Sequence, residues 1–543
     1  MKKKLWRGTR AGALVGALLL AATACTGPQT TGTGGQGGEG GGGSAVNVFL
    51  YQKPKGVFSP MAPASGPDFY VQSLVFMPLM QPGPDLQLTP RAAKSMEASE
   101  DAKTFTFKLR DDLKWTDGTP FTAKDVVMTF NLLADAKTGT ASSGNFATVE
   151  GFDEFKAGTA DKVSGFQAPD DHTFVMKSKT ANMGLPALVV PTAMILPEHI
   201  LGSKKPEEMA NEPFFKKPDV GLGPYSVTEY KTDQYVDLKK NPNFPGGVGV
   251  DEVFLKPVTN DVAVAQLGTG EMDLASVPAS ELATVKGMDK IKLSTAKDGG
   301  FTRMAVNQER EQLKNPKVRQ GLMYGMDREA MVKSIFPEGN ARVRNSAFDP
   351  TITGDGIEQY KHDQGKAKQL LTEGGWDFSK ELEVQWIAGG NPDRDAAATI
   401  FQAQMAEIGV KVKLTHIEAA QQTDSLTNGN YDLMLMAGGN YATNSWSVAP
   451  IIGCDTFYPK GANLGHYCNP ELDAKLKEAN TIADESERNA KYAEAAKIEN
   501  AEVSYLWLYN FDTNWAQNSK LEGVTPLALG SGFYNPEEWK LSK

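Results

Sequence analysis

The sequence is poor in the residues that catalyse reactions or hold metal ions. Among 543 residues there are three cysteines and five histidines. The histidines stand far apart, each in a polar or turn-like context: His172, His199, His362, His416 and His466. Neither a G-x-S-x-G nucleophile elbow, nor an H-E-x-x-H zinc motif, nor a Walker A phosphate-binding loop occurs. We therefore expect no enzymatic activity, no cofactor and no metal site, with a secreted hydrolase that uses paired carboxylates as a remote alternative.

An excess of positive charge and further long apolar runs are also missing. The chain carries 56 lysines and arginines against 66 aspartates and glutamates, which is a formal net charge of -10. Nucleic-acid binding is therefore not expected, because it requires a basic surface. After the N-terminal segment no apolar run reaches the roughly 18 residues of a membrane helix, so we expect the body of the chain to be soluble.

The N-terminal segment has the pattern of a bacterial export signal. Basic residues precede the apolar stretch Ala11 to Ala22, which is shorter than the roughly 20 residues needed to span a bilayer. Thr23-Ala24-Cys25 then resembles a lipobox, although Ala22 stands where lipoboxes usually carry leucine. We expect a lipoprotein signal peptide over 1–25 that ends at a lipidated Cys25, followed by a glycine-rich tether over 26–44. An ordinary cleaved signal peptide is the alternative.

The other two cysteines, Cys454 and Cys468, enclose a polar segment that contains glycine and proline. In an exported protein such a pair favours a disulfide, which would restrain this loop. Free thiols are one alternative. A metal site that uses His466 and Cys468 is another, but it lacks further ligands at a suitable spacing.

The body of the chain, about 500 residues, is too large for one hydrophobic core and predicts two or three domains. Thr104 to Leu109 alternates polar and apolar residues as a half-buried strand does, and Thr122 predicts a helix start with Asp125 three residues later. From about residue 315 onward, predicted helices and strands alternate, which indicates a parallel or mixed sheet and an α/β fold. Strands are expected at 383–387, 410–414 and 431–436, and helix starts at Asn315-Pro316, Asp327, Asp363, about Asp393 and Asn469-Pro470.

Two of these strands are followed by the same four residues, Ala-Gly-Gly-Asn, at 388–391 and 437–440. In open α/β sheets ligands bind beyond the carboxyl ends of the strands, where glycine lets the backbone approach a ligand closely. Both strand ends are therefore candidate sites, although Gly-Gly-Asn also makes an ordinary turn. Tyr441 and Trp446 favour the second copy, since they add flat apolar surface.

Many short motifs follow one another in the order of a single known family. They are Leu86–Glu97, Thr104–Arg110, Lys114–Val127, Gly223–Tyr225, Lys240–Phe244, Gly270–Asp273, Val318–Gln320 with Met326–Arg328, Ala367–Trp376 and Tyr467–Asp473. On these motifs the chain resembles the family 5 extracellular solute-binding proteins of the oligopeptide- and dipeptide-binding type, which deliver solutes to bacterial ABC importers. The resemblance covers about residues 68–510, and most of the motif residues are expected to be structural.

The resemblance implies a two-lobed periplasmic-binding-protein-like fold, of type II and the large cluster-C kind, with an extra inserted subdomain. The implied boundaries are 46–65, 186–298 and 502–543 for lobe I, 66–185 for the inserted subdomain, and 299–501 for lobe II. The chain then crosses between the lobes more than once, which makes a hinge of several strands. A ligand that contacts both lobes stabilises the closed state, which the transporter recognises.

We expect the ligand between the lobes. The residues expected to contact it are Asn440, Tyr441, Asn444 and Trp446 in lobe II, with Phe301, Arg303 and Tyr70 as weaker candidates near the hinge or a lobe edge. Peptide binders of this family commonly place an aspartate after the strand that corresponds to 431–436, where it pairs with the peptide's amino group. Here no acid occurs between Asp432 and Asp455.

The implied function is therefore capture of a small solute, most simply a peptide, for delivery to an ABC transporter permease. An oligosaccharide or another neutral solute is the alternative, because amide and aromatic groups suit uncharged ligands. We expect a monomer without a nucleic-acid partner. It would be lipid-anchored to the cell membrane, in the periplasm or on the cell surface.

Overall fold

The computed structural model describes residues 44–61, 66–84, 87–140, 142–337, 339–354, 356–387, 392–439, 448–459, 461–527 and 532–542. The expected signal peptide, the lipidation site Cys25 and nearly all of the glycine tether lie outside the described residues. Within these ranges, no helix combines the length and the apolar character needed to cross a membrane.

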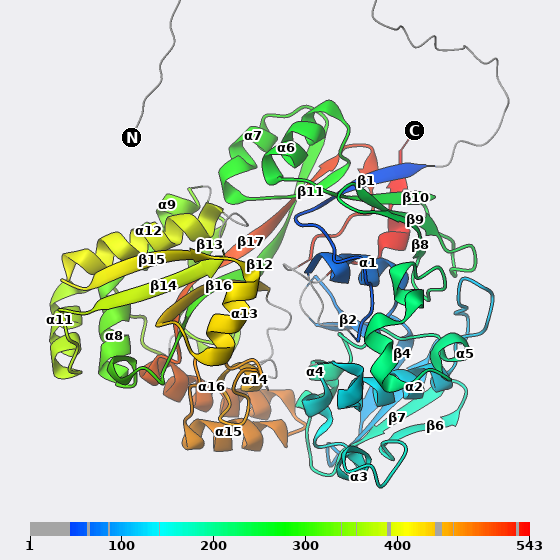
Figure 1. Cartoon of the computed structure of the whole chain (residues 1–543), viewed down its shortest axis with the longest axis horizontal. Coiled ribbons are helices and arrows are strands. Elements are labelled where there is room, and N and C mark those ends of the chain that lie inside the picture. The colour runs from blue at the N-terminus through cyan, green and yellow to red at the C-terminus, as the bar shows by residue number, and fades with distance from the viewer. Residues whose placement is uncertain are drawn as a thin grey trace, which may run out of the picture. The chain divides into compact units, whose positions relative to one another are not determined.

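Two long strands lie at the centre of the main sheet (Figure 1). β12 (Ile291–Val306) and β17 (Tyr505–Asn518) pair in antiparallel fashion, with shifts in register between Ala296 and Gly300 and between Thr302 and Arg303. The order in this 11-stranded sheet is β15-β14-β16-β12-β17-β11-β1-β10-β9-β8, and β13 pairs with β17. The other strands are β1 (Ala45–Leu50), β8 (Tyr225–Lys231), β9 (Tyr235–Lys240), β10 (Glu252–Pro257), β11 (Leu274–Val277), β13 (Ala341–Val343), β14 (Glu381–Ile387), β15 (Lys411–Ile417) and β16 (Leu433–Gly439). β14 is parallel to both neighbours and β16 is antiparallel to β12, which confirms the predicted mixed sheet.

On the β1 side of the sheet, the strands separate two hydrophobic cores. Val46, Val48 and Leu50 of β1 are buried in the larger core, whereas Phe49 points to the opposite face and packs in a smaller one. This follows from the two-residue period of a strand. The helices on this side are α1 (Gly66–Val75), α4 (Gly184–Val189), α5 (Glu198–Leu201), α6 (Asn260–Thr269) and α7 (Leu282–Lys286).

A separate four-stranded antiparallel sheet, in the order β4-β5-β7-β6, adjoins the larger core. The predicted strand at 104–109 is its β5, with Phe105, Phe107 and Leu109 buried. Thr122 caps α2 (Ala123–Ala134) and forms the predicted capping box with Asp125. The remaining elements are β2 (Met80–Pro82), β3 (Leu88–Pro90), β4 (Ala93–Ala98), β6 (Phe166–Asp170), β7 (Thr173–Lys177) and α3 (Phe152–Lys156).

On the β15 side, helices cover both faces of the sheet (Figure 1). Leu433 and Leu435 of β16 point into a core with α8, α9, α11 and α12, while Met434 points into a second core with α14, α15 and α16. The helices are α8 (Pro316–Gly325), α9 (Arg328–Ile335), α10 (Pro350–Thr353), α11 (Gln364–Glu373), α12 (Pro392–Glu407), α13 (Ala419–Asn428), α14 (Ala449–Ile452), α15 (Pro470–Asn480) and α16 (Glu485–Glu502). A short β18 (Leu521–Glu522) pairs with β19 (Lys540–Leu541) near the C-terminus.

Candidate functional site

The structure places only part of the predicted ligand contacts. Phe301, Arg303 and Tyr70 are described. The other predicted contacts lie outside the described residues: Asn440, Tyr441, Asn444 and Trp446. Phe301 and Arg303 stand two residues apart on β12, so their side chains share one face of the strand.

Tyr70 belongs to a different part of the molecule from these two residues. It lies on α1 in the core around β1 and is 5% exposed. Its ring meets those of Tyr51 and Phe533 edge to face, with centroids 6.3 and 5.1 Å away. These contacts give Tyr70 a packing role in the described structure.

β16 ends later than predicted. The sequence predicted a strand up to Met436 and a ligand-facing turn from Ala437, but β16 continues to Gly439, and Gly438 pairs with Phe301 of β12. That boundary was wrong, because Gly438 and Gly439 still pair with β12. A Cβ atom on Gly438 would lie 2.6 Å from Cζ of Phe301. Glycine at this position therefore makes room for the ring inside the strand pair.

Two arginine side chains and three aromatic rings meet beside this strand pair. We call the cluster of Arg303, Arg344, Phe301, Tyr505 and Trp507 the arginine cage. The Cζ atom of Arg303 lies 4.1 Å from the ring centroid of Tyr505 and 5.3 Å from those of Phe301 and Trp507. The Cζ atom of Arg344 lies 4.8 and 4.6 Å from the ring centroids of Phe301 and Trp507. Ring faces at these distances attract a guanidinium cation.

The two guanidinium groups of the cage differ in their hydrogen bonding. Arg344 donates hydrogen bonds to the carbonyl oxygens of Ser346 and Ala347 and to Oδ1 of Asn510. Nε and Nη1 of Arg303 are buried, and neither has a hydrogen-bond partner in the described part of the chain. Burial lowers the pKa of Arg303, and burial together with the charge of Arg303 lowers the pKa of Arg344 to about 10.

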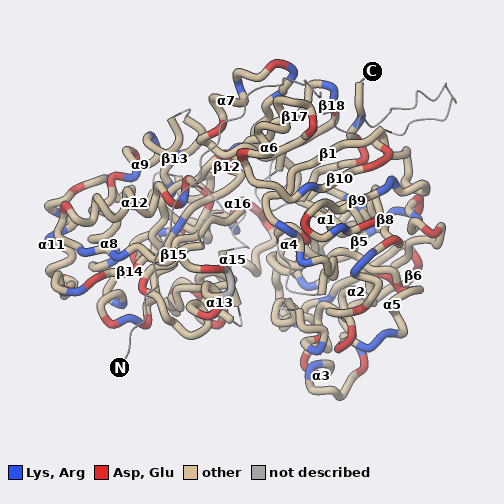
Figure 2. Tube along the Cα trace, turned by 45° about the horizontal axis from the view of Figure 1, so that its top comes forward, with Lys and Arg blue, Asp and Glu red and all other residues tan. Residues whose placement is uncertain are grey.

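A negative charge that acts on both arginines of the cage belongs to Glu499, which is fully buried on α16. Its carboxylate accepts hydrogen bonds from the hydroxyls of Ser346 and Ser504, from Nε1 of Trp507 and from the backbone of Ala347. Glu499 is thus held by neutral donors, while two buried arginines stand close by. Acidic and basic residues are mixed along the described chain (Figure 2).

A second group of ionisable residues lies at the start of α12, just after the first Ala-Gly-Gly-Asn copy. Burial raises the pKa of Asp393 to about 6, against a smaller opposing effect of Arg394. Burial lowers the pKa of Arg394, and Asp395, Tyr509 and Tyr51 oppose that shift. Tyr51 directly follows β1, and Arg394 lies in α12 after β14. In the main sheet β1 and β14 lie on opposite sides of the central strands β12 and β17, so these ionisable residues come from both sides of the central pair.

Cys454 and Cys468 form a disulfide, with Cα atoms 4.5 Å apart. Inside the closed loop the side-chain amide of Asn463 donates to the carbonyl oxygens of Gly453 and Tyr467. Phe457 stacks on His466 with ring centroids 4.8 Å apart. The loop is therefore held by local contacts as well as by the disulfide.

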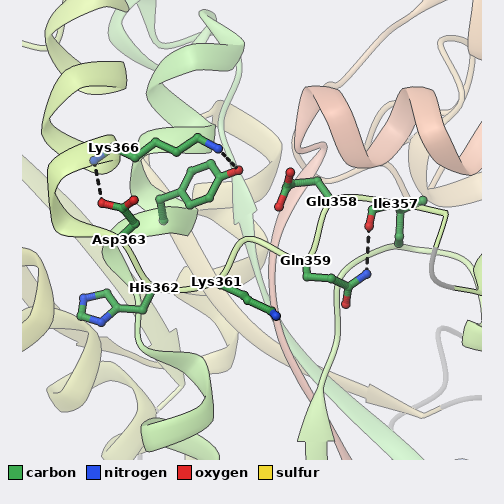
Figure 3. A pocket seen from close by; sticks show the side chains of 8 residues that line it. Ile357, Glu358, Gln359, Lys361, His362, Asp363 and Lys366 are labelled. Carbon is green, nitrogen blue, oxygen red and sulfur yellow. Dashed lines mark hydrogen bonds between the residues drawn. The ribbon is translucent and has the colours of Figure 1, made fainter.

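The pocket shown in Figure 3 has a volume of about 450 Å³ and lies beside the start of α11. Its lining residues are Tyr324, Ile357, Glu358, Gln359, Lys361, His362, Asp363 and Lys366. Lys366 lies over the Tyr324 ring and bonds to its hydroxyl, while Asp363 caps α11. These groups are engaged in supporting the helix start. Among the described residues no cluster of histidine, cysteine, aspartate and glutamate could hold a metal ion.

Sequence reasoning missed several residues of these clusters. Trp507 and Tyr505 lie in a stretch whose sequence is typical of a buried core strand. No motif around Arg344 indicates a role in a site. Asp393 was recognised only as a helix start. Aromatic and aliphatic residues alternate along β17, and this pattern indicates that aromatic rings line a single face of the strand.

Comparisons with known proteins agree with the fold described above. Residues 87–458 match the family model described as bacterial extracellular solute-binding proteins, family 5 Middle. A putative ABC transporter peptide-binding protein of Brucella melitensis is 27% identical over 501 residues, which is 90% of this chain and 91% of the relative. The oligopeptide-binding protein AppA of Bacillus subtilis is 25% identical over 499 residues, 87% of each chain.

Solved structures show the same fold. The structure of Bacillus subtilis AppA in complex with a nonapeptide has a TM-score of 0.79 at 23% identity, over 92% of this chain and 99% of that chain. The ABC transporter substrate-binding protein CtaP of Listeria monocytogenes has a TM-score of 0.79 at 25% identity, over 92% and 100%. The expected α/β fold of the periplasmic-binding-protein type is thereby confirmed, and the sheet of β4 to β7 forms its extra subdomain.

Proposed function

Because the chain belongs to family 5 of the bacterial extracellular solute-binding proteins, we propose that it captures short peptides and delivers them to the permease of an ABC importer. As a member of this family the chain is a transport component and not an enzyme. The observation that carries the peptide assignment is the kinship with relatives named as peptide-binding over about nine tenths of the chain.

A partly buried carboxylate supports the peptide assignment. The segment between Asp432 and Asp455 contains no acid that could pair with a peptide's amino group. Asp393 lies after the neighbouring parallel strand β14, and its burial raises its pKa to about 6. An ammonium group beside it would restore the charged carboxylate, since an opposite charge lowers the pKa of an acid. We propose Asp393 as the partner of the solute's amino group.

Capture proceeds in this proposal by closure of two lobes. Lobe I comprises 46–65, 186–298 and 502–543, with the inserted subdomain at 66–185, and lobe II comprises 299–501. β12 and β17 run between the two sides of the sheet and would serve as the hinge. A solute that contacts both lobes stabilises the closed state by its difference in affinity for the two states. Tyr70 and Phe301 remain proposed contacts, as do Asn440, Tyr441, Asn444 and Trp446 outside the described residues.

The proposal includes a lipid anchor. A diacylated Cys25 and the glycine-rich tether would hold the protein at the outer face of the cell membrane, where it meets both its solute and the permease. Mass spectrometry of the membrane fraction should find the mature chain starting at a lipid-modified Cys25. An unmodified N-terminus elsewhere would contradict the anchor without affecting the assignment to the family.

Native mass spectrometry of freshly purified protein tests the peptide assignment most directly. We expect co-purifying masses that fragment into short peptides, and compaction in small-angle X-ray scattering when a peptide pool is added to the stripped protein. Failure to bind any peptide pool, together with thermal stabilisation by an oligosaccharide, would overturn the assignment in favour of a neutral solute. Peptide binding without compaction would contradict lobe closure but would leave the peptide assignment standing.

A further inference from the structure

Arg303 is a buried cation whose bonding capacity is only partly used. It is 7% exposed, and its Nε and Nη1 atoms have no hydrogen-bond partner among the described residues. Burying a charged group is unfavourable unless hydrogen bonds and a counter-charge replace the lost water. The three ring faces of the cage offset part of this cost but accept no N–H bond in the plane of the guanidinium.

Other buried arginines on the β15 side of the sheet show how the fold normally holds a buried guanidinium group. Arg319 and Arg328 are 1% and 3% exposed. Each donates several hydrogen bonds to main-chain carbonyl oxygens around it. Arg344 is held in the same way by the loop that follows β13. Arg303 departs from this pattern, so its burial is not explained by support of neighbouring backbone.

Arg303 also has little counter-charge close to it. Arg344 stands against the same two rings, Phe301 and Trp507, and its charge disfavours a second cation beside it. Glu499 is the carboxylate that acts on Arg303, and it is already held by hydroxyl, indole and backbone donors. Asp349 and Asp298 act in addition on Arg344. An additional anion beside Arg303 would therefore be electrostatically favourable.

The cage lies close to the molecular surface. Phe301 of β12 is only half-buried, and so are Met436, Ala437 and Gly438 of the adjacent strand. The Arg303 guanidinium is stacked on this half-buried ring, with its Cζ atom 5.3 Å from the ring centroid.

We propose that Arg303 binds an anionic group of the solute, a carboxylate, and so makes the protein selective for acidic solutes or for peptides with a free C-terminus. Arg344 is a positioning residue that adds positive potential and keeps Phe301 and Trp507 in place. The inference rests on the proposed solute-binding function and argues against the neutral-solute alternative. A carboxylate at this position would accept charge-assisted hydrogen bonds from the unpaired nitrogens of Arg303 and would balance the charge of Arg303.

The test compares three tetrapeptide pools by affinity-selection mass spectrometry. The first has neutral side chains and a free C-terminal carboxylate, the second has the same sequences as C-terminal amides, and the third consists of amides with one glutamate. Wild-type protein should bind the first or the third pool at least about tenfold more tightly than the second, as expected when charged hydrogen bonds are lost. Preference for the first pool identifies the terminal carboxylate, and preference for the third identifies an acidic side chain.

Arg303→Met should reduce this preference to within about twofold, because it removes the charge and keeps much of the side-chain length. Arg342→Met is the matched control. Arg342 lies on β13 outside the cage and forms ion pairs with Asp298 and Asp512, so its loss should leave the preference intact. Equal affinity of the wild type for the neutral amides, or an unchanged preference in R303M, would overturn the inference while leaving peptide binding standing.

A second measurement does not depend on peptides. Sodium acetate, compared with sodium chloride at equal ionic strength, should raise the melting temperature of the wild type more than that of R303M. If no peptide pool binds, the peptide assignment fails, and this comparison alone decides the anion site: equal shifts in both proteins overturn it. Ligand-free R303M should also melt no lower than the wild type. A fall like that expected for Arg328→Met would assign Arg303 a structural role instead.

Discussion

The start of α12 offers a prediction that follows directly from the burial of one carboxyl group. Asp393 has its pKa raised from 3.8 to about 6. A carboxyl that binds its proton more tightly in the folded state makes the protein less stable as pH rises, and the loss is complete above the folded-state pKa. A shift of about two pKa units corresponds to a cost of about 3 kcal/mol at high pH. About 2 kcal/mol of it develops between pH 4.5 and pH 7.5.

Asp393→Asn removes this titration and keeps the shape of the side chain. We therefore expect the free energy of unfolding of D393N, relative to the wild type, to rise by about 2 kcal/mol between pH 4.5 and pH 7.5. Urea unfolding followed by tryptophan fluorescence at several pH values measures this difference. Asp455→Asn is the control for the loss of one negative charge, because it removes a carboxylate whose side chain is 89% exposed.

The same variant connects stability with function. If Asp393 pairs with the solute's amino group, a bound peptide lowers the pKa of Asp393, and binding becomes tighter as pH rises from 5 to 7. D393N should lose both the affinity and its pH dependence. A stability difference between D393N and the wild type that stays flat from pH 4.5 to 7.5 would refute the reasoning, since it would mean that Asp393 titrates alike in the folded and unfolded chain.

Three further predictions concern the framework of the fold. Arg328→Met should destabilise the protein by about 3–5 kcal/mol in urea unfolding, because it leaves several buried carbonyl oxygens without donors; a loss below about 1 kcal/mol would contradict that role. Reduction of the Cys454–Cys468 disulfide, which spans 14 residues, should cost about 3 kcal/mol and speed hydrogen exchange around Phe457 more than elsewhere; recovery of both thiols alkylated without reductant would disprove the bridge. Thr122→Ala should lower the free energy of unfolding by about 1 kcal/mol through loss of the capping box on α2. Thr122→Ser should retain most of the stability, and equal losses in both variants would indicate a packing role for Thr122 instead.

Features that depend on neighbours in the chain were predicted well. The caps at Thr122, Asn315, Asp363 and Asn469 appear as expected, because a cap forms between residues within one helical turn. The alternating strand at 104–109 and the mixed character of the main sheet follow in the same way from hydrophobic period and element order. The order of the family motifs led to the fold, since each motif marks a turn or helix start that the fold requires.

The sequence by itself determined the class of protein, the element types and the local caps, because these depend on residue patterns a few positions long. Only the tertiary structure decided the content of the candidate site. Arg303, Arg344, Glu499 and Trp507 are far apart in the chain, and their burial against one another follows from the pairing of β12 with β17 and the packing of α16. The extension of β16 to Gly439 depends likewise on its pairing with β12, where glycine at position 438 makes room for the Phe301 ring. Whether a charge is paired, stacked or left with unused donors is a property of that packing, and no local pattern encodes it.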